Sequence, residues 1–196
     1  MNIPPATDNN ISVLKKEGVY LLMEEITVKS CKEVINWILE ENLQAKKKPF
    51  LQLMISSPGG DVSSCFALID IMNGSKIPIR TIGLGCVASC GLSIFMSGAK
   101  GHRTLTPNTS ILSHQWAWGS SGKEHELFAT IKEFKLTTQR TLDHYKKCTG
   151  LSEKMIREIL LPPQDVWLSA KEALKYRLCD KVKTLPDCSL REPVSV

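Results

Sequence analysis

Ser89 stands in surroundings that suit nucleophilic catalysis. It lies within residues 85–91 (GCVASCG), where we expect a buried strand to turn into a helix. A serine in the first turn of a helix sits beside unpaired backbone N–H groups and the positive end of the helix dipole. An oxyanion formed at Ser89 could therefore be stabilised by the N–H of Cys90 and by that of Gly60, as in an oxyanion hole. The plainer interpretation is that Ser89 only caps the helix.

The N–H of Gly60 belongs to a glycine-containing turn, residues 56–60 (SSPGG), that follows a predicted strand. Two adjacent glycines allow backbone conformations that other residues avoid, so N–H groups here can line a concave site. A simple strand-to-helix turn would have the same composition. The residues around Ser89 do not fit the pattern G-x-S-x-G, because Val87 stands two residues before the serine. The nucleophile turn of α/β-hydrolases is therefore not indicated.

His114 is the candidate for a general base, because it lies at the end of an apolar predicted strand, residues 110–114 (SILSH). The other histidines lie in polar or helix-surface contexts: His102, His125 and His144. A histidine acts as a base when it reaches the nucleophile and a carboxylate holds its other ring nitrogen. Without such partners, His114 would be a structural residue. Spacing leaves three candidates for the carboxylate: Asp165, Asp143 and Asp180.

Alternating strands and helices must position these residues. Apolar runs predict strands at residues 19–23, 50–55, 79–84, 110–114 and 180–185, with Gly85 ending the third. Helical spacing and caps predict helices that begin at a Ser30–Glu33 capping box, at Asp61, near Ala88, before Leu127, at Ser152 and at a Ser169–Glu172 capping box. Strands that alternate with helices form βαβ units. We therefore expect an α/β fold with right-handed crossovers and a mainly parallel sheet.

Length and composition fit one globular domain. Of the 196 residues, 42% are hydrophobic and 23% are charged, which suits a chain that buries its own core.

We expect a loose arm over residues 1–17, a domain over 18–185 and a frayed tail over 186–196. The longest weakly polar stretch, 88–99, falls far short of the ~20 residues of a membrane span. No secretory signal is apparent, and the charge of +5 is too dispersed to predict a nucleic-acid surface.

Seven cysteines, an odd number with no C-x-x-C pair, suit reduced and buried thiols. Such thiols are typical of the cytoplasm or an equivalent reducing compartment. Scattered histidines and unpaired cysteines do not build a tetrahedral zinc site, so we expect neither a metal nor a cofactor.

Three segments, taken together in their order and spacing, resemble the Clp protease proteolytic subunit, the serine peptidase of the caseinolytic protease family. The resemblance extends from about residue 19 to residue 182 and implies a crotonase-like α/β fold. The segments are SSPGGDV (56–62), GCVASCGLSIFMSGAKGHRTLTPNTSILSHQ (85–115) and DVWLSAKEALKYRLCDKV (165–182).

The resemblance implies a role for each candidate residue. Ser89 matches the family's nucleophile, His114 its general base, and Asp165 the acid that precedes the W-L-S-A segment. The backbone N–H groups of Gly60 and Cys90 match the oxyanion hole. The implied activity is cleavage of unfolded polypeptides and peptides through an acyl-enzyme.

The resemblance also implies an assembly. Two heptameric rings would stack as a tetradecamer around a chamber, with residues 119–148 forming the handle that interlocks the rings. The expected partners are further copies of the chain, paralogous Clp subunits, an AAA+ Clp ATPase and polypeptide substrates. No membrane or nucleic-acid partner is expected.

The sequence departs from the family pattern where the ATPase would dock. The segment before the first predicted strand is short, and the positions of the docking pockets are less aromatic than in the family, at Gln52, Met54 and Gly74. Both departures predict weak docking of an ATPase without affecting hydrolysis.

Further departures lie near the candidate site. Cys90 replaces the family's usual methionine, and a thiol beside the nucleophile could be oxidised. Trp116 and Trp118 add bulk just beyond His114, where they could line the substrate groove or serve only the structure.

Three alternatives remain open. A catalytically weak or inactive Clp-like subunit would act as a ring scaffold or regulator, although the set of Ser89, His114 and Asp165 argues against it. A crotonase-type acyl-CoA enzyme would use paired backbone N–H groups without the Ser-His-Asp order. A cysteine nucleophile, Cys86 or Cys90, is disfavoured because Cys90 occupies the oxyanion position.

Overall fold

A mainly parallel sheet forms the centre of the chain in the computed structural model, which describes residues 9–117, 119 and 121–184. Within this part, seven strands belong to the sheet. Strand β5 (Ser110–Ser113) pairs in parallel with β3 and antiparallel with β6 (Val166–Ser169). The other strands follow one another with parallel pairings: β1 (Val19–Leu22), β2 (Leu51–Ser57), β3 (Ile79–Ala88), β4 (Arg103–Leu105) and β7 (Lys181–Val182). The predicted α/β class and mainly parallel sheet are confirmed.

Strand β3 pairs with β2 along one edge and with two successive partners along the other, where Gly85 (φ +57°) interrupts it with a left-handed residue. The part before this glycine pairs with β4 through residues 81–83, and the part after it pairs with β5 through residues 86–88. The prediction that Gly85 ends the strand is therefore wrong. The strand continues to Ala88 and carries Ser89 to the end of β5.

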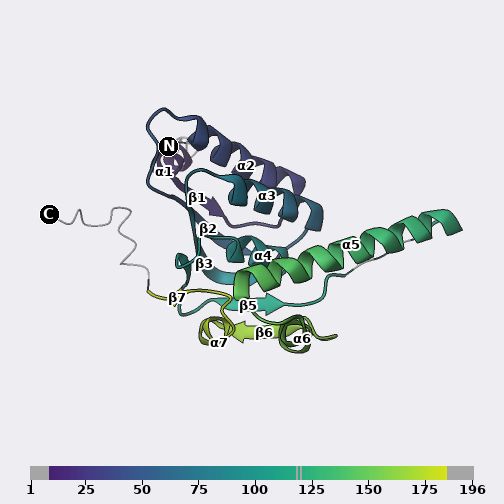
Figure 1. Ribbon diagram of the computed structural model, residues 1–196. Helices are drawn as coiled ribbons and strands as arrows, with labels where there is room; N and C mark the ends of the chain where they lie inside the picture. The colour runs from purple at the N-terminus through teal and green to yellow at the C-terminus, as the bar shows by residue number, and fades with distance from the viewer. Residues whose placement is uncertain (1–8, 118, 120, 185–196) are drawn as a thin grey trace, which may run out of the picture.

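Helices α2 (Val28–Leu43) and α3 (Val62–Gly74) lie side by side on one side of the strands (Figure 1). Helix α3 begins as predicted, with the carboxylate of Asp61 accepting the N–H of Ser64 at 2.7 Å. Helix α2 begins earlier than predicted, because Thr27 rather than Ser30 is its N-cap. The Thr27 hydroxyl accepts the N–H of Ser30, and the Ser30 hydroxyl accepts the N–H of Thr27.

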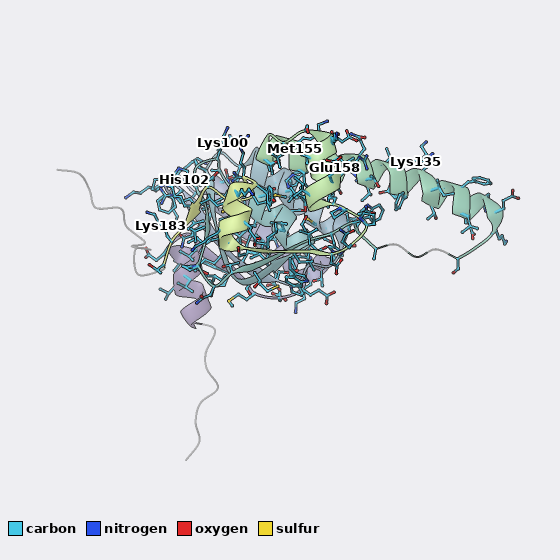
Figure 2. All side chains as sticks on the ribbon, turned by 90° about the horizontal axis from the view of Figure 1, so that it is seen from below. Lys100, His102, Lys135, Met155, Glu158 and Lys183 are labelled. Atoms are coloured by element: carbon cyan, nitrogen blue, oxygen red, sulfur yellow. The ribbon has the colours of Figure 1, made fainter. Side chains whose placement is uncertain are left out.

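The predicted long amphipathic helix is confirmed as α5 (Glu124–Thr149), which follows the short helix α4 (Cys90–Met96) and the strands β4 and β5. Much of α5 projects from the body of the molecule, with Lys135 on the projecting part (Figures 1 and 2). Gly150 ends the helix in a left-handed conformation (φ +69°), and its N–H donates to the carbonyl of Lys146. Several apolar side chains of α5 are exposed: Leu127, Phe128, Ile131, Phe134 and Leu136.

The N-terminal end of the described chain is helical where a loose arm was predicted, and the C-terminal end has the predicted helix caps. Residues 9–16, expected to be part of a loose arm, form helix α1 (Asn9–Lys16). The C-terminal helices are α6 (Glu153–Met155), its π-helical continuation η1 (Ile156–Leu160) and α7 (Ala170–Lys175), and both predicted caps, Ser152 and Ser169, are present. Residues 1–8, the end of the last predicted strand and the predicted tail lie outside the described residues.

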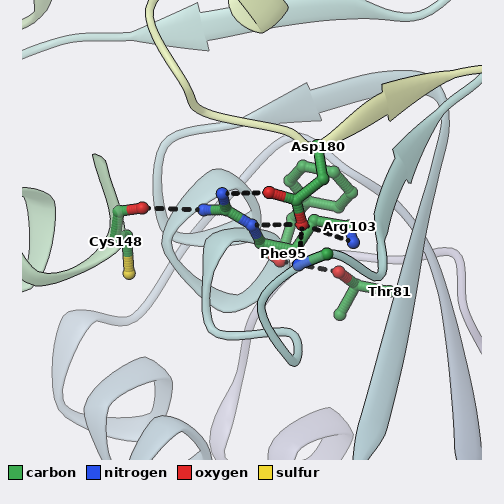
Figure 3. Close-up of polar contacts among 6 residues, drawn as sticks. Thr81, Phe95, Arg103, Cys148 and Asp180 are labelled. Atoms are coloured by element: carbon green, nitrogen blue, oxygen red, sulfur yellow. Dashed lines mark hydrogen bonds and ion pairs between the residues drawn. The ribbon is translucent and has the colours of Figure 1, made fainter. Parts of the chain in front are cut away.

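A buried ion pair joins β4 to the segment before β7 (Figure 3). The guanidinium of Arg103 donates to both carboxylate oxygens of Asp180, at 2.6 and 3.0 Å, and to the carbonyl of Cys148 at 3.0 Å. Asp180 also accepts the N–H of Gly101 at 2.8 Å. Burial raises the pKa of Asp180, but the hydrogen bonds and charge of Arg103 outweigh burial and lower it below its ordinary value. Asp180 is thus committed to a structural ion pair.

Candidate active site

Ser89 occupies a sharp turn between β3 and α4. Its φ of +54° and ψ of −121° are unusual for a residue with a side chain, and among the described non-glycine residues only Arg177 also has a positive φ. The N–H of Ser89 donates to the carbonyl of Leu112 at 2.9 Å, which holds the turn against β5. Gly59 lies so close that a Cβ there would be 2.6 Å from the Ser89 Cβ. Ser89 is therefore a half-buried residue that belongs to neither β3 nor α4 but to the turn between them.

The pairing of β5 brings His114 to this turn. Because Ala88 is opposite Leu112 in the parallel register, Ser89 and His114 both lie just past the end of their paired strands. The His114 side chain is 24% exposed, so its ring is partly shielded from water yet open on one side.

The pairing of β6 selects the carboxylate. Val166 is opposite Ser113 in the antiparallel register, so the next pair outward is His114 and Asp165. The Nδ1 of His114 lies 3.6 Å from the Oδ1 of Asp165, whose side chain is 64% exposed. The separation is too long for a hydrogen bond but within the range of a charge interaction.

The rival carboxylates are engaged elsewhere. Asp180 is held by Arg103, as described above. Asp143 is exposed on α5, where it accepts a hydrogen bond from the Gln139 amide at 3.0 Å and lies 3.7 Å from the Lys146 ammonium. Of the three candidates, Asp165 is thus the one beside His114.

Ser89 and His114 line one cavity of about 220 Å³. Its walls are mostly apolar, and Trp116 stacks on Phe134 of α5 at one side, with ring centroids 4.8 Å apart. Trp116 therefore lies in the cavity wall, whereas Trp118 lies outside the described residues. Within the described part of the chain, no hydrogen bond joins Ser89 to His114. Catalytic contacts are often long in unliganded enzymes and shorten when substrate binds.

Gly60 and Cys90 stand on opposite sides of the Ser89 turn. Gly60 (φ +142°) is paired with Ile26, but this pairing uses the carbonyl of Gly59 and the N–H of Asp61. The N–H of Gly60 is therefore not consumed by the pairing. A Cβ at Gly60 would lie 2.2 Å from the Ile26 carbonyl oxygen, so the position requires glycine. Cys90 is the first residue of α4, where N–H groups have no partner within the helix.

The sulfur of Cys90 faces Gly60. Its thiol donates to the Gly60 carbonyl at 3.2 Å, and the thiol of Cys65 on α3 donates to the Cys90 carbonyl at 3.4 Å. Hydrogen bonding with Cys65 lowers the pKa of Cys90, and burial opposes the shift. Cys86, the other thiol considered as a nucleophile, does not line the cavity of Ser89.

The remaining histidines and cysteines are not gathered into a metal site. In the part of the chain that the structure describes, no group of three or more His, Cys, Asp or Glu side chains could hold a metal ion. His144 is buried, with its Nε2 2.9 Å from the Ser93 carbonyl. The six described cysteines are free thiols, four of them buried, and Cys188 lies outside the described residues. Likewise, no helix among the described residues is long and apolar enough to cross a membrane.

The positions expected to receive an ATPase are not equally accessible. Gly74 is exposed at the end of α3 and Met54 is half-buried, but Gln52 is only 7% exposed within β2. The interpretation of Gln52 as a surface position is therefore wrong for the isolated subunit.

Comparison with known proteins shows that the chain is similar to one protein family over most of its length. A model of the Clp protease family matches residues 5–185. The chain is 34% identical over 173 residues to the ATP-dependent Clp protease proteolytic subunit of Streptococcus sanguinis, covering 87% of each chain. It is 33% identical over 163 residues to the ATP-dependent Clp protease proteolytic subunit 1 of Chlamydia muridarum, covering 81% of this chain and 82% of the relative. For the subunit from Deinococcus radiodurans, identity is 37% over 133 residues, or 67% and 64% of the two chains.

Proposed function

Because the chain belongs to the Clp protease family, a family of serine-type endopeptidases, we propose that it cleaves peptide bonds with Ser89, His114 and Asp165 as its catalytic residues. The observation that carries this proposal is the pairing of β5 with both β3 and β6. These two pairings bring together residues that are far apart in the sequence: Ser89 and His114 line one cavity, and Asp165 lies beside His114. The domain of residues 18–185 would be the catalytic domain.

The geometry supports a division of labour between the two ring nitrogens of His114. Nδ1 faces Asp165, so Nε2 is left to take the proton of the Ser89 hydroxyl. Ser89 then attacks the peptide carbonyl, and the protonated His114 donates its proton to the leaving amine. Asp165 stabilises the charged imidazole, and water hydrolyses the acyl-enzyme by the same steps in reverse.

The oxyanion of each tetrahedral intermediate would be held by the N–H groups of Gly60 and Cys90. Both donors are backbone groups whose positions are fixed before substrate arrives, which is the arrangement that stabilises a developing charge most. The apolar cavity beside Ser89 would receive one side chain of the polypeptide substrate.

Labelling with an active-site fluorophosphonate tests this function directly. We expect the probe to phosphonylate Ser89 in the full-length protein, with the modified residue located by mass spectrometry of peptides. An assembled protein that neither labels nor cleaves a short fluorogenic peptide would instead fit the ring scaffold or regulator.

Asp165→Asn should lower kcat for a fluorogenic peptide by about 10²–10⁴-fold with little change in KM, because an amide holds the imidazole in the wrong tautomer and cannot stabilise its charge. Asp143→Asn, an exposed carboxylate on α5, is the matched control and should keep wild-type kcat. Equal effects of the two substitutions on steady-state kinetics would contradict the role of Asp165.

The exposed stripe on α5 supports assembly into the family's double ring, with residues 119–148 as the handle. A projecting helix with Phe128, Ile131 and Leu136 exposed is unfavourable in water unless a second copy covers it. We propose two stacked heptameric rings, which enclose the active sites and receive unfolded chains from an AAA+ Clp ATPase. Paralogous subunits would be further partners in these rings.

Ile131→Glu should weaken this assembly, because it places a charge in the apolar stripe of α5. We expect mass photometry to show a shift from the tetradecamer to single rings or smaller species. Lys135→Glu changes an exposed charged residue of the same helix and should preserve the assembly. An unchanged mass for Ile131→Glu would exclude this stripe as the contact between rings.

A further inference from the structure

The thiol of Cys90 joins the two backbone segments that carry the proposed oxyanion-hole amides. Cys90 Sγ donates to the carbonyl of Gly60 at 3.2 Å, and Cys90 itself begins α4. Gly60 belongs to the turn after β2, which comes from a separate part of the chain. Cys90 as a residue is 6% exposed, so this contact is shielded from competing water.

A second thiol extends the link. Cys65 of α3 donates to the Cys90 carbonyl at 3.4 Å, and it is 1% exposed. Helix α3 starts directly after Gly60, with Asp61 as its N-cap. The turn, the start of α3 and the start of α4 are therefore connected through the two sulfur atoms.

Backbone pairing holds Gly60 on one side only. The carbonyl of Gly59 and the N–H of Asp61 bind Ile26, which leaves the Gly60 peptide to be held toward α4 by other contacts. Gly60 has no side chain to anchor it, and a Cβ there is sterically excluded. The thiol of Cys90 is the contact that reaches this peptide from α4.

We propose that Cys90 is a positioning residue, whose side chain fixes the Gly60 peptide relative to α4 and thereby sets the separation of the two oxyanion-hole amides. This inference rests on the proposed function. It concerns a contact that the methionine usual in the family could not make, because a thioether has no hydrogen to donate.

The proposal predicts a pH dependence. Hydrogen bonding with Cys65 lowers the pKa of the Cys90 thiol despite burial. As pH rises through that pKa, the thiol loses the hydrogen that it donates to Gly60 and places a negative charge beside the oxyanion, so kcat should fall. The titratable and charged groups that face Cys90 or its cavity from neighbouring elements are Cys31, Cys65, Asp61, His114, Tyr145 and Arg157.

The test compares Cys90→Ser, which keeps an O–H donor, with Cys90→Ala, which removes it, in the full-length assembled protein. We expect Cys90→Ala to lower kcat about tenfold with KM unchanged, which is the size of effect of losing one modest hydrogen bond. Cys90→Ser should stay within about threefold of wild type and shift the alkaline fall of kcat to higher pH. A peptide boronate, which forms a tetrahedral anion on the serine, should bind Cys90→Ala more weakly by the same factor as kcat falls.

Cys179→Ala, which alters another buried thiol far from Ser89 along the chain, controls for the loss of a core thiol. If Cys90 only packs the core, Ala should be tolerated at least as well as Ser, and boronate affinity should follow thermal stability. Wild-type kcat in Cys90→Ala, or an unchanged alkaline limb in Cys90→Ser, would overturn the proposal. Failure of the proposed function is a separate result, because the wild-type protein would then not be labelled by fluorophosphonate at all.

Discussion

Replacing Ser89 with alanine should abolish peptide hydrolysis, lowering kcat by at least about 10⁴-fold, because no acyl-enzyme can form without the hydroxyl. The residual rate should be close to that given by the oxyanion hole and substrate binding alone. Measurement requires a fluorogenic peptide at saturating concentration and the fluorophosphonate probe, which should leave Ser89→Ala unlabelled. The assembly should be unaffected, since a half-buried hydroxyl at a turn contributes little to packing.

Ser97→Ala provides the matched control, because Ser97 ends the same helix, α4, outside the cavity of Ser89. It should retain both labelling and hydrolysis. Hydrolysis that survives in Ser89→Ala and is blocked by N-ethylmaleimide would contradict the assignment and indicate a cysteine nucleophile. Hydrolysis that survives and resists the maleimide would point to a site elsewhere in the chain.

Local context made Ser89 and His114 candidates, but it could not choose among Asp165, Asp143 and Asp180, because that choice depends on long-range pairing. Strand β6 was not predicted, because its four residues include the 58% exposed Trp167 and show no clear apolar alternation. Its pairing with β5 is what brings Asp165 to His114. A pairing between short strands about fifty residues apart leaves no periodic signal in either strand. The family resemblance implied Asp165, and the strand register supplies the physical reason for its position beside His114.

Gly85 shows a second limit of local reasoning. Glycine is a frequent end of a strand, but it also allows a left-handed residue inside one. Which of the two occurs depends on whether another strand is available to pair with the residues beyond it. Here β5 supplies that partner, so β3 continues to Ala88. The caps at Asp61 and Ser169, which depend only on neighbouring residues, were predicted correctly.

Contacts between distant side chains were the least accessible to sequence reasoning. Cys90 was recognised as a departure from the family, but its bond to Gly60 depends on the approach of two turns. The stacking of Trp116 on Phe134 likewise depends on where α5 crosses the cavity. Residue type suggested that these positions matter, and only the fold shows what each one touches.

After the loss of activity in Ser89→Ala, the next largest effect that we expect is a loss of folding stability when the Arg103–Asp180 ion pair is broken. Arg103→Met should lower the free energy of unfolding by about 3–5 kcal/mol, because it leaves the carboxylate of Asp180 partly buried without its counter-charge. Unfolding in urea, at fixed protein concentration because assembly also stabilises the fold, would measure the loss. The matched control is Arg157→Met, which removes an exposed i,i+4 ion pair with Glu153 and should cost less than about 1 kcal/mol. Equal losses from the two substitutions would show that burial adds nothing to the Arg103 pair.

The pH dependence of the same pair has a definite sign. The folded-state pKa of Asp180 is below its ordinary value, so the carboxylate stabilises the fold fully above the unfolded pKa, near about 4. That contribution is lost as pH falls through the folded pKa. The stability difference between wild type and Asp180→Asn should therefore be constant near neutral pH and shrink in acid.

The double variant Arg103→Met with Asp180→Leu should be more stable than either single variant, because replacing both partners leaves no unpaired charge in the core.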